Sequence, residues 1–543
     1  MRVEETELTQ LNRELHMKNE DQLDIIIIGA GPAGLQAGHY LGKMGFRYII
    51  LEAGDNPGTS FETHPRHRKL ISINKVYTGY DDAEINLRWD WNSLLADDPD
   101  PVLFKQFSKK YFPAAEDLLK YMTAYAEKHQ LKIRYRSKVA LVRRPNDFVV
   151  ETESGDVFNA KAVMVATGVP KSWLPNIPGI EHAVPYSSMS IEQDAYINKH
   201  VLILGKGNSG FETADHLTEV AATIHICSPN PLKFAWSTHF VGHLRAVNNT
   251  FLDTYQLKSQ NAVLDATITK IERKGDKFTV SFSYQHAEGE IEEIQYDSII
   301  ACTGFRFDAE IFSEECRPQL CAMGRLPAQK ANWESTNVPD LFFAGTIMQY
   351  RDYKKYMSGF IHGFRYNVRT LCHLLCEKYV DLPYPAGIFT NSADVLLERI
   401  ASRINSSSGL WQQPGFLGDV FASRGEGDDR FEHREELPID YVHEQFAPTG
   451  RPYLIVTLEF GSSKFENPFN VPRIARDNIV RAERSNFLHP VVRLCCNGRI
   501  INEHHVIEDL AGEWKEPEHL DPLKAFLRSI ELTINVAEPM AAV

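Results

Sequence analysis

The sequence predicts an α/β protein with two Rossmann-like dinucleotide-binding domains and a C-terminal α+β accessory region. An apolar strand, a glycine-rich turn and a helical pattern follow one another twice, first from Asp24 and again from Val201. Beyond residue 435 the pattern changes to short strands, of which 453–460 is the clearest, and a helix near 522–532. The repeated βαβ openings predict two parallel sheets, and the changed pattern predicts a further, smaller domain.

The same patterns suggest where the domains begin and end. Residues 1–22 are polar and charged, so we expect a flexible N-terminus. Residues 23–180 and 300–378 are expected to form one discontinuous nucleotide-binding domain, with the second domain inserted at 181–299. Serines from Ser406 onward and the charged run 424–430 indicate a linker over 379–435, which leaves 436–543 as the accessory domain.

Composition and charge exclude several classes of function. The chain is 43% hydrophobic and 24% charged, as in ordinary globular proteins, and its net charge is −14. An acidic surface argues against nucleic acid as a partner. No apolar run reaches the roughly 18 residues of a membrane span, and the N-terminal stretch lacks the apolar segment of a secretion signal. We therefore expect a cytoplasmic protein with a small-molecule substrate, and leave homo-oligomer formation open.

The eight cysteines are expected to be free thiols. None forms a C-x-x-C pair, and a chain of 543 residues with so few cysteines does not indicate a disulfide framework. Cys316 with Cys321, and the adjacent Cys495 and Cys496, are the spacings that come nearest to a redox pair, but neither is that of a dithiol reductase. No metal site is expected.

The first glycine-rich turn has the context of a dinucleotide-binding site. Gly29 permits the tight turn, Gly31 lets the backbone approach a pyrophosphate, and Gly34 allows the helix to pack closely on the strand. Pro32 and Ala33 open the helix, whose N-terminal N–H groups and dipole attract phosphate. Glu52 follows the next strand, 23 residues after Gly29, where a carboxylate accepts both ribose hydroxyls of an adenosine.

The second turn repeats this arrangement without the acidic residue. Its cofactor-binding candidates are Gly205, Gly207, Asn208, Ser209 and Gly210. The position equivalent to Glu52 is Ser228, which can bond a 2′-phosphate with Lys233 nearby, so NADPH is favoured over NADH; alternatively, Ser228 simply begins a turn. Two dinucleotides in one chain have shared chemistry when one is FAD and the other a nicotinamide, because hydride passes between them.

These motifs resemble the flavin-containing monooxygenase superfamily. The segments that carry the resemblance are the two glycine-rich turns, 166–168 with Gly168, 302–304, 344–346 with Gly345, and 111–126. Further segments at 65–75, 86–95, 253–259, 359–366, 486–490 and 506–509 are similar to FAD flavoproteins of the endoplasmic reticulum. The resemblance implies a two-dinucleotide-binding flavoprotein that uses FAD and NADPH. It further implies oxygenation of a small nucleophilic nitrogen, sulfur or activated carbon substrate through a C4a-hydroperoxide.

One departure from that family keeps a second function open. The monooxygenase fingerprint F-x-G-x-x-x-H is absent, and the stretch 183–188 has serine where histidine would stand. An NAD(P)H-dependent flavin reductase or oxidase that passes electrons to a protein or quinone, without oxygenation, is therefore the alternative. A non-catalytic flavoprotein adaptor is a third hypothesis, which two intact glycine-rich turns disfavour.

Candidate catalytic residues lie between the first turn and residue 95. Ser72 and Asn74 match the Ser-Asn segment that holds the flavin peroxide in the monooxygenases, and an amide can donate there without delivering a proton; alternatively Asn74 caps a turn. Arg88 and Asn92 are the other catalytic candidates, in a tryptophan-rich segment expected to line a substrate pocket or to pack in the core. A helix of about 357–377, beginning near Gly359, is expected to aim its positive end at the flavin.

Overall fold

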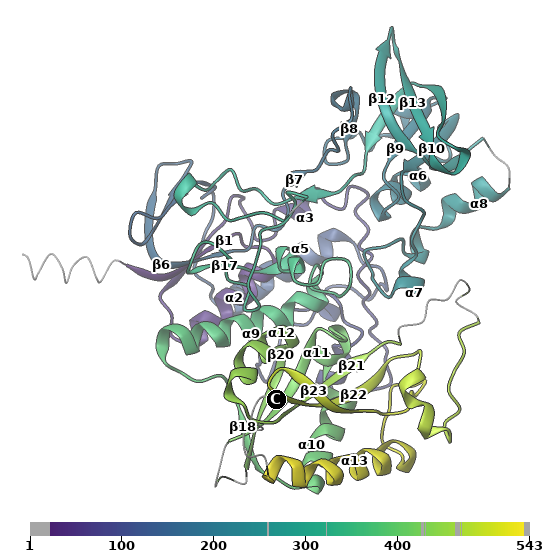
Figure 1. Cartoon of the computed structure of the whole chain (residues 1–543). Coiled ribbons are helices and arrows are strands. Elements are labelled where there is room, and N and C mark those ends of the chain that lie inside the picture. The colour runs from purple at the N-terminus through teal and green to yellow at the C-terminus, as the bar shows by residue number, and fades with distance from the viewer. Residues whose placement is uncertain are drawn as a thin grey trace, which may run out of the picture.

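The computed structural model describes residues 22–257, 260–321, 323–424, 428, 430–461, 467 and 470–536. Three large sheets organise this part of the chain, and two smaller sheets of three and two strands accompany them. Figure 1 shows the large sheets as three lobes, with the N-terminal units in purple to teal and the C-terminal unit in green to yellow. The flexible N-terminus expected over 1–22 lies, except for Gln22, outside the described residues. Within the described residues, every helix is too short or too polar to cross a membrane.

The first sheet is built on the first glycine-rich unit. Its strands are β1 (Leu23–Ile28), β2 (Tyr48–Leu51), β3 (Ile133–Arg134), β4 (Val139–Arg143), β5 (Phe148–Thr152), β6 (Val157–Val165) and β17 (Leu341–Phe343). The order β3-β2-β1-β6 is parallel, β17 joins β6 in parallel, and β5 and β4 add an antiparallel ribbon. Ile25 to Ile28 are buried because helices cover the sheet, as a continuous apolar run requires.

Helices α2 (Pro32–Lys43), α5 (Ala115–Lys128) and α9 (Ile361–Val380) pack on this sheet, and α2 lies against both of the others. The helix predicted near 357–377 thus begins at Ile361. Its preceding residue, Phe360, is extended, so Gly359 lies just outside the helix.

The second sheet is built on the second glycine-rich unit. It runs in the parallel order β11 (Ala262–Asp265), β10 (Thr223–Ser228), β9 (His200–Leu204), β15 (Ser298–Ala301) and β8 (Val184–Pro185). Helix α6 (Asn208–Leu217) follows β9 directly, and an antiparallel sheet of β12 (Thr267–Lys274), β13 (Lys277–Tyr284) and β14 (Glu290–Tyr296) extends outward (Figure 1). The two segments that cross between the lobes pair as β7 (Lys171–Ser172) and β16 (Phe305–Arg306), which joins the lobes along a short ribbon.

The C-terminal lobe contains a six-stranded antiparallel sheet. Its order is β18 (Gly387–Thr390), β20 (Arg430–Pro438), β19 (Leu417–Ser423), β21 (Tyr453–Glu459), β22 (His489–Cys496) and β23 (Arg499–His505). Helices α10 (Ala393–Ser406) and α13 (Pro517–Val536) pack together below one face, as Figure 1 shows. The opposite face is continuous with the first lobe, since Val420, Ile455 and Cys495 share one hydrophobic core with Leu371 and Leu375 of α9.

The predicted linker over 379–435 is wrong. These residues supply β18, α10, α11 (Ser408–Gln412), β19 and most of β20, so they are the core of the C-terminal lobe. The prediction failed because β20 contains many charged residues and few apolar ones, as an exposed linker would. In the folded protein some of these charged side chains are buried. Glu436 of β20 is 2% exposed and accepts from Arg369 of α9 at 2.6 Å and from Arg403 of α10 at 2.9 Å.

Candidate dinucleotide sites and their junction

The first glycine-rich turn packs tightly against backbone at two of its glycines and faces open space at the third. Gly29 has φ +103°, and a Cβ there would lie 2.9 Å from the carbonyl oxygen of Ala166. A Cβ on Gly34 would lie 1.9 Å from the oxygen of Gly29, whereas one on Gly31 would meet no atom within 4 Å. Gly31 is the N-cap of α2 and provides no side-chain cap, so the first N–H groups of the helix face this open side.

Residues from three other strand ends surround this turn. Glu52, after β2, is buried and accepts from the N–H of Ala30 at 2.6 Å and from that of Gly54 at 2.9 Å. Gly345, after β17, has φ +82°, and a Cβ there would lie 2.8 Å from Cβ of Ala33. Gly168, after β6, also has positive φ and open space around it. The predicted residues Gly29 to Gly34, Glu52 and Gly345 are therefore brought together.

The second turn has the same geometry. Gly205 has φ +109°, and a Cβ there would lie 2.3 Å from the oxygen of Cys302, as Gly29 does with Ala166. A Cβ on Gly210 would lie 2.3 Å from the oxygen of Gly205, and one on Gly207 would again meet no atom within 4 Å. Gly207 caps α6 without a side chain. Both turns thus fit a diphosphate, which needs close backbone approach and uncapped helix N–H groups.

The side chain of Asn208, predicted to bind the nucleotide, instead bonds to groups of the protein. Its Nδ2 donates to the carbonyl oxygen of His243 at 2.8 Å, and its Oδ1 accepts from the N–H of Arg245 at 2.9 Å and from Nδ2 of Asn248 at 3.0 Å. The amide therefore fixes the 242–248 loop against α6. Asn208 and its neighbour Ser209 remain nucleotide-binding candidates through their backbone N–H groups at the helix start.

Ser228, expected just after this strand, is the last residue of β10, and the neighbouring strand adds a charge pair that was not predicted. Ser228 lies opposite Asp265 in the β10–β11 register. Lys206, from inside the glycine-rich turn, forms an ion pair with Asp265 and donates to the carbonyl oxygen of Ser228 at 3.1 Å. A lysine between two turn glycines is the signal that would have located this pair. Lys233 is exposed.

The amide of Asn74 does not have a free donor. Asn74 is 2% exposed, and its Nδ2 donates to the carbonyl oxygens of Ser108 at 2.8 Å and Lys110 at 3.2 Å. Both N–H bonds thus hold the 108–111 segment. The role predicted for it, donation to a group above the flavin, does not fit this geometry. The alternative, a cap on a turn, is not what the amide does either, because the carbonyls that it bonds are 34 and 36 residues away in the chain.

Ser72 and Asn92 form a local pair. The hydroxyl of Ser72 donates to Oδ1 of Asn92 at 2.5 Å, and Nδ2 of Asn92 donates to the oxygen of Ile73 at 3.2 Å. Asn92 is fully buried, so it supports this loop from the inside. A direct catalytic contact by Asn92 is not favoured by this burial.

Arg88 faces the C-terminal lobe. Its guanidinium lies 4.6 Å from the ring of Trp411 in α11 and donates to the oxygen of Ile404 at 3.2 Å. Burial lowers the pKa of Arg88 to about 10, which leaves it charged at neutral pH. The catalytic role predicted for Arg88 therefore does not fit, because the side chain binds two lobes together.

Unpartnered polar groups gather instead where α9 begins. Among the described residues, the buried Nε1 of Trp91, Nδ1 of His362 and Oδ1 of Asp352 have no hydrogen-bond partner. The Trp91 and His362 rings stack with centroids 4.1 Å apart, and the guanidinium of Arg245 lies 5.2 Å from the Trp91 ring. Burial lowers the pKa of His362 well below its usual range and raises that of Asp352 to about 7. Buried polar groups usually have hydrogen-bond partners, so these atoms are available to bond a bound group.

A second junction joins the first two lobes. Tyr186 accepts from the N–H of Arg66 at 2.9 Å and donates to Oε2 of Glu212 in α6 at 3.3 Å. Arg66 also donates to the oxygen of Met189 at 2.7 Å. Burial raises the pKa of Glu212 to about 7, against the opposing effects of the Tyr186 hydrogen bond and of Lys69. Arg66 thus contacts the second lobe, as does His67 through Thr213 of α6 at 3.4 Å, and the sequence showed no sign of this interdomain contact.

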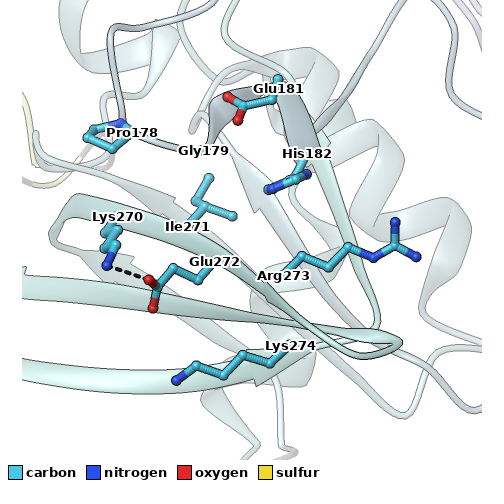
Figure 2. Close-up of a pocket in the computed structure, with 9 residues that line it drawn as sticks. All are labelled: Pro178, Gly179, Glu181, His182, Lys270, Ile271, Glu272, Arg273 and Lys274. Atoms are coloured by element: carbon cyan, nitrogen blue, oxygen red, sulfur yellow. Dashed lines mark ion pairs between the residues drawn. The ribbon is translucent and has the colours of Figure 1, made fainter.

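The hollow lined by Pro178, Glu181, His182 and the 270–274 stretch of β12 lies away from both turns. Figure 2 shows the ion pair between Lys270 and Glu272, with Arg273 and Lys274 further along the same strand. No residue of either glycine-rich turn lines it. This hollow is therefore not the dinucleotide site.

Comparison with known proteins extends this description. A family model described as pyridine nucleotide-disulphide oxidoreductase matches residues 26–345. FAD-dependent oxidoreductase domain-containing protein 2 of Danio rerio is 34% identical over 94% of this chain and 84% of that protein, and its Mus musculus counterpart is 34% identical over 96% and 86%. The solved flavin-containing monooxygenase from Stenotrophomonas maltophilia covers 66% of this chain and 99% of its own, with 21% identity and a TM-score of 0.50. That structural likeness concerns the fold, and the resemblance inferred from the sequence is confirmed.

Replacing Glu212 with Gln should stabilise the protein in a pH-dependent way. Because the folded-state pKa is raised to about 7 from the usual value near 4.3, the folded state binds the extra proton and loses stability as pH rises through this window. The variant lacks that loss, so its melting temperature should exceed that of the wild type clearly at pH 8 and only slightly at pH 4, where the loss has hardly begun, as measured by circular dichroism.

The control is Glu153→Gln, which removes an exposed carboxylate paired with Lys138 and should change the melting temperature little at either pH. An equal difference between E212Q and wild type at both pH values would contradict the assignment of a buried, titrating carboxyl at this junction.

Proposed function

The chain belongs to the pyridine nucleotide-disulphide oxidoreductase family, and from this premise we propose that it is an FAD-dependent oxidoreductase that takes hydride from NADPH. The observation that carries the proposal is the equal geometry of the two glycine-rich turns. Each has a glycine with positive φ, a glycine in contact with it and a glycine open to solvent at an uncapped helix start. A protein that binds two dinucleotides can couple them when one is a flavin.

The first turn is the better fit for FAD. Glu52 places a carboxylate where ribose hydroxyls would bind, and Gly345 brings a third strand end against Ala33. The unpartnered nitrogens of Trp91 and His362 at the start of α9 supply donors or acceptors for a ring edge. When bound, FAD accepts hydride from the nicotinamide and passes two electrons onward.

The second turn is the better fit for NADPH. Its strand end carries the hydroxyl of Ser228 rather than a carboxylate, and Lys206 provides a cation beside it. Asp265 pairs with Lys206 and leaves little net charge there, so a 2′-phosphate would have to compete with Asp265 for this lysine.

The geometry favours transfer of electrons to a protein or quinone over oxygenation of a substrate. The amide donors of Asn74 are engaged by Ser108 and Lys110, and the 183–188 stretch lacks the histidine of the monooxygenase fingerprint. Among the described residues the cysteines are free and none forms a C-x-x-C pair, so a dithiol of this chain is not proposed as the acceptor.

Replacing Gly31 with Val should impair the binding of FAD alone, and replacing Gly207 with Val should impair the binding of NADP+ alone. Because a Cβ at either position meets no protein atom within 4 Å, the variants should fold, and the side chain should block only the diphosphate. We expect G31V to be purified without bound flavin. G207V should keep its flavin and bind NADP+ at least about tenfold more weakly, a change of about 1.4 kcal/mol.

Flavin content is read from the absorbance spectrum and NADP+ affinity from titration calorimetry. Each variant is the control for the other, whereas a change at Gly34 is uninformative because its Cβ would collide with Gly29. A yellow G31V protein, or a G207V protein that loses flavin and keeps NADP+ affinity, would contradict the assignment of FAD to the first turn and NADPH to the second.

Replacing Ser228 with Asp should shift nucleotide preference toward NADH. A carboxylate at the end of β10 accepts ribose hydroxyls and repels a 2′-phosphate. The ratio of kcat/KM for NADPH to that for NADH should fall by about tenfold, or about 1.4 kcal/mol. Ser190→Asp adds the same charge at an exposed site of this lobe and should leave the ratio unchanged; an unmoved ratio in S228D sinks the proposed 2′-site.

The fate of oxygen tests the acceptor. If electrons leave without oxygenation, aerobic NADPH oxidation should return the consumed oxygen as hydrogen peroxide, and a quinone should accelerate it. Amines, thiols and amino acids should not accelerate it or gain label from 18O2, as measured by mass spectrometry. Labelled product formed at a substrate-dependent rate would show instead that the protein is a monooxygenase.

A further inference from the structure

Two histidines and an aspartate from three separate segments lie close together in the first lobe. His39 lies on α2, Asp98 in the loop that follows residue 95, and His129 at the C-terminal end of α5. One side-chain nitrogen or oxygen of each lies within 4.8 Å of the others. The His39 and His129 rings are 4.1 Å apart between centroids, and Nδ1 of His129 is 3.5 Å from Oδ2 of Asp98.

The two imidazoles have the environment of metal ligands. His39 is 7% exposed, and its Nε2 is 2.7 Å from the carbonyl oxygen of Ala96. An imidazole that donates one N–H to a backbone carbonyl presents a lone pair on its other nitrogen, which is the usual support of a metal-bound histidine. The His129 side chain is 6% exposed, and its Nε2 has no hydrogen-bond partner among the described residues.

A lysine now occupies part of the space beside the carboxylate. Nζ of Lys43 lies 3.5 Å from Oδ1 of Asp98 and donates to the carbonyl oxygens of Ala96 at 3.4 Å and Asp97 at 3.2 Å. Its side chain is 47% exposed, so it can turn to solvent when another cation binds. Lys43 is therefore a competitor for Asp98.

We propose that His39, Asp98 and His129 form a binding site for a divalent transition-metal ion such as Zn2+, with water as the remaining ligand. Two imidazoles and one carboxylate suit zinc and its neighbours, whereas Mg2+ and Ca2+ prefer oxygen ligands throughout. The ion would join the C-terminal half of α2 to the end of α5 and to the 96–98 loop. The sequence alone predicted no metal site, because no short motif places these residues together.

The test is a zinc titration of the full-length protein after treatment with a chelator, using a chromophoric chelator as competitor. The wild type should bind one equivalent at this site and melt at a higher temperature with zinc, because binding to the folded state alone stabilises it. His129→Gln and Asp98→Asn should each weaken this binding at least about tenfold. His505→Gln, which disrupts the separate His489–His505 pair, should leave it unchanged.

Lys43→Met provides a test that does not depend on altering a buried ligand. Removing the competing ammonium should strengthen zinc binding and should give clearer visible bands of tetrahedral Co2+, read beyond the flavin absorption. No zinc binding by the wild type, equal binding by D98N and H129Q, or unchanged or weaker binding by K43M would each overturn the proposal. In that case the cluster is an aromatic contact that includes Tyr125, whose ring is 4.4 Å from that of His129.

Discussion

Contact between backbone and backbone at two helix starts is the constraint on which the rest of the structure depends. At each start, one glycine must have positive φ and another must pass within contact distance of it, so that the helix begins directly above the strand. The helix N–H groups then have no side-chain cap, and their partial positive charge faces an open side. Everything inferred about nucleotide chemistry follows from these two uncapped and uncovered helix starts.

The rest of the structure holds residues in place around those helix starts. Helix α9 packs on α2 of the first lobe with one side and contributes to the core of the C-terminal sheet with another. Arg369 on α9 and Arg403 on α10 share Glu436, so the C-terminal lobe is joined to the first lobe by burial and by charge. An ion pair this deeply buried requires both partners, since either charge alone would be strongly penalised. The C-terminal lobe is thus part of one structure with the first lobe.

How well the sequence predicted the candidate site depended on the type of residue. Gly29, Gly34 and Glu52 were located from the sequence because they stand at recognisable places in a strand–turn–helix–strand pattern, and that pattern is visible without knowledge of their spatial neighbours. The contacts of Asn74, Asn92 and Arg88 do not favour the catalytic roles predicted for them, because a side chain's role depends on which groups the fold brings to it. Asn74 meets carbonyls 34 and 36 residues away, and Arg88 meets a residue 316 positions away. Glu212 and the unpartnered nitrogens at α9 were missed for the same reason, whereas Lys206 had a local signal in its place between two turn glycines.

The sequence by itself determined the two βαβ units, their glycine-rich turns and the acid after the second strand, because strand, turn and helix formation are set by short-range pattern and backbone sterics. It also indicated the separate α+β region. Only the tertiary structure decided that residues 379–435 are the core of that region rather than a linker, since the charges of β20 are buried against partners from α9 and α10. It also decided which polar groups are already bonded and which remain available, because hydrogen-bond partners distant in sequence become neighbours only when the chain is folded.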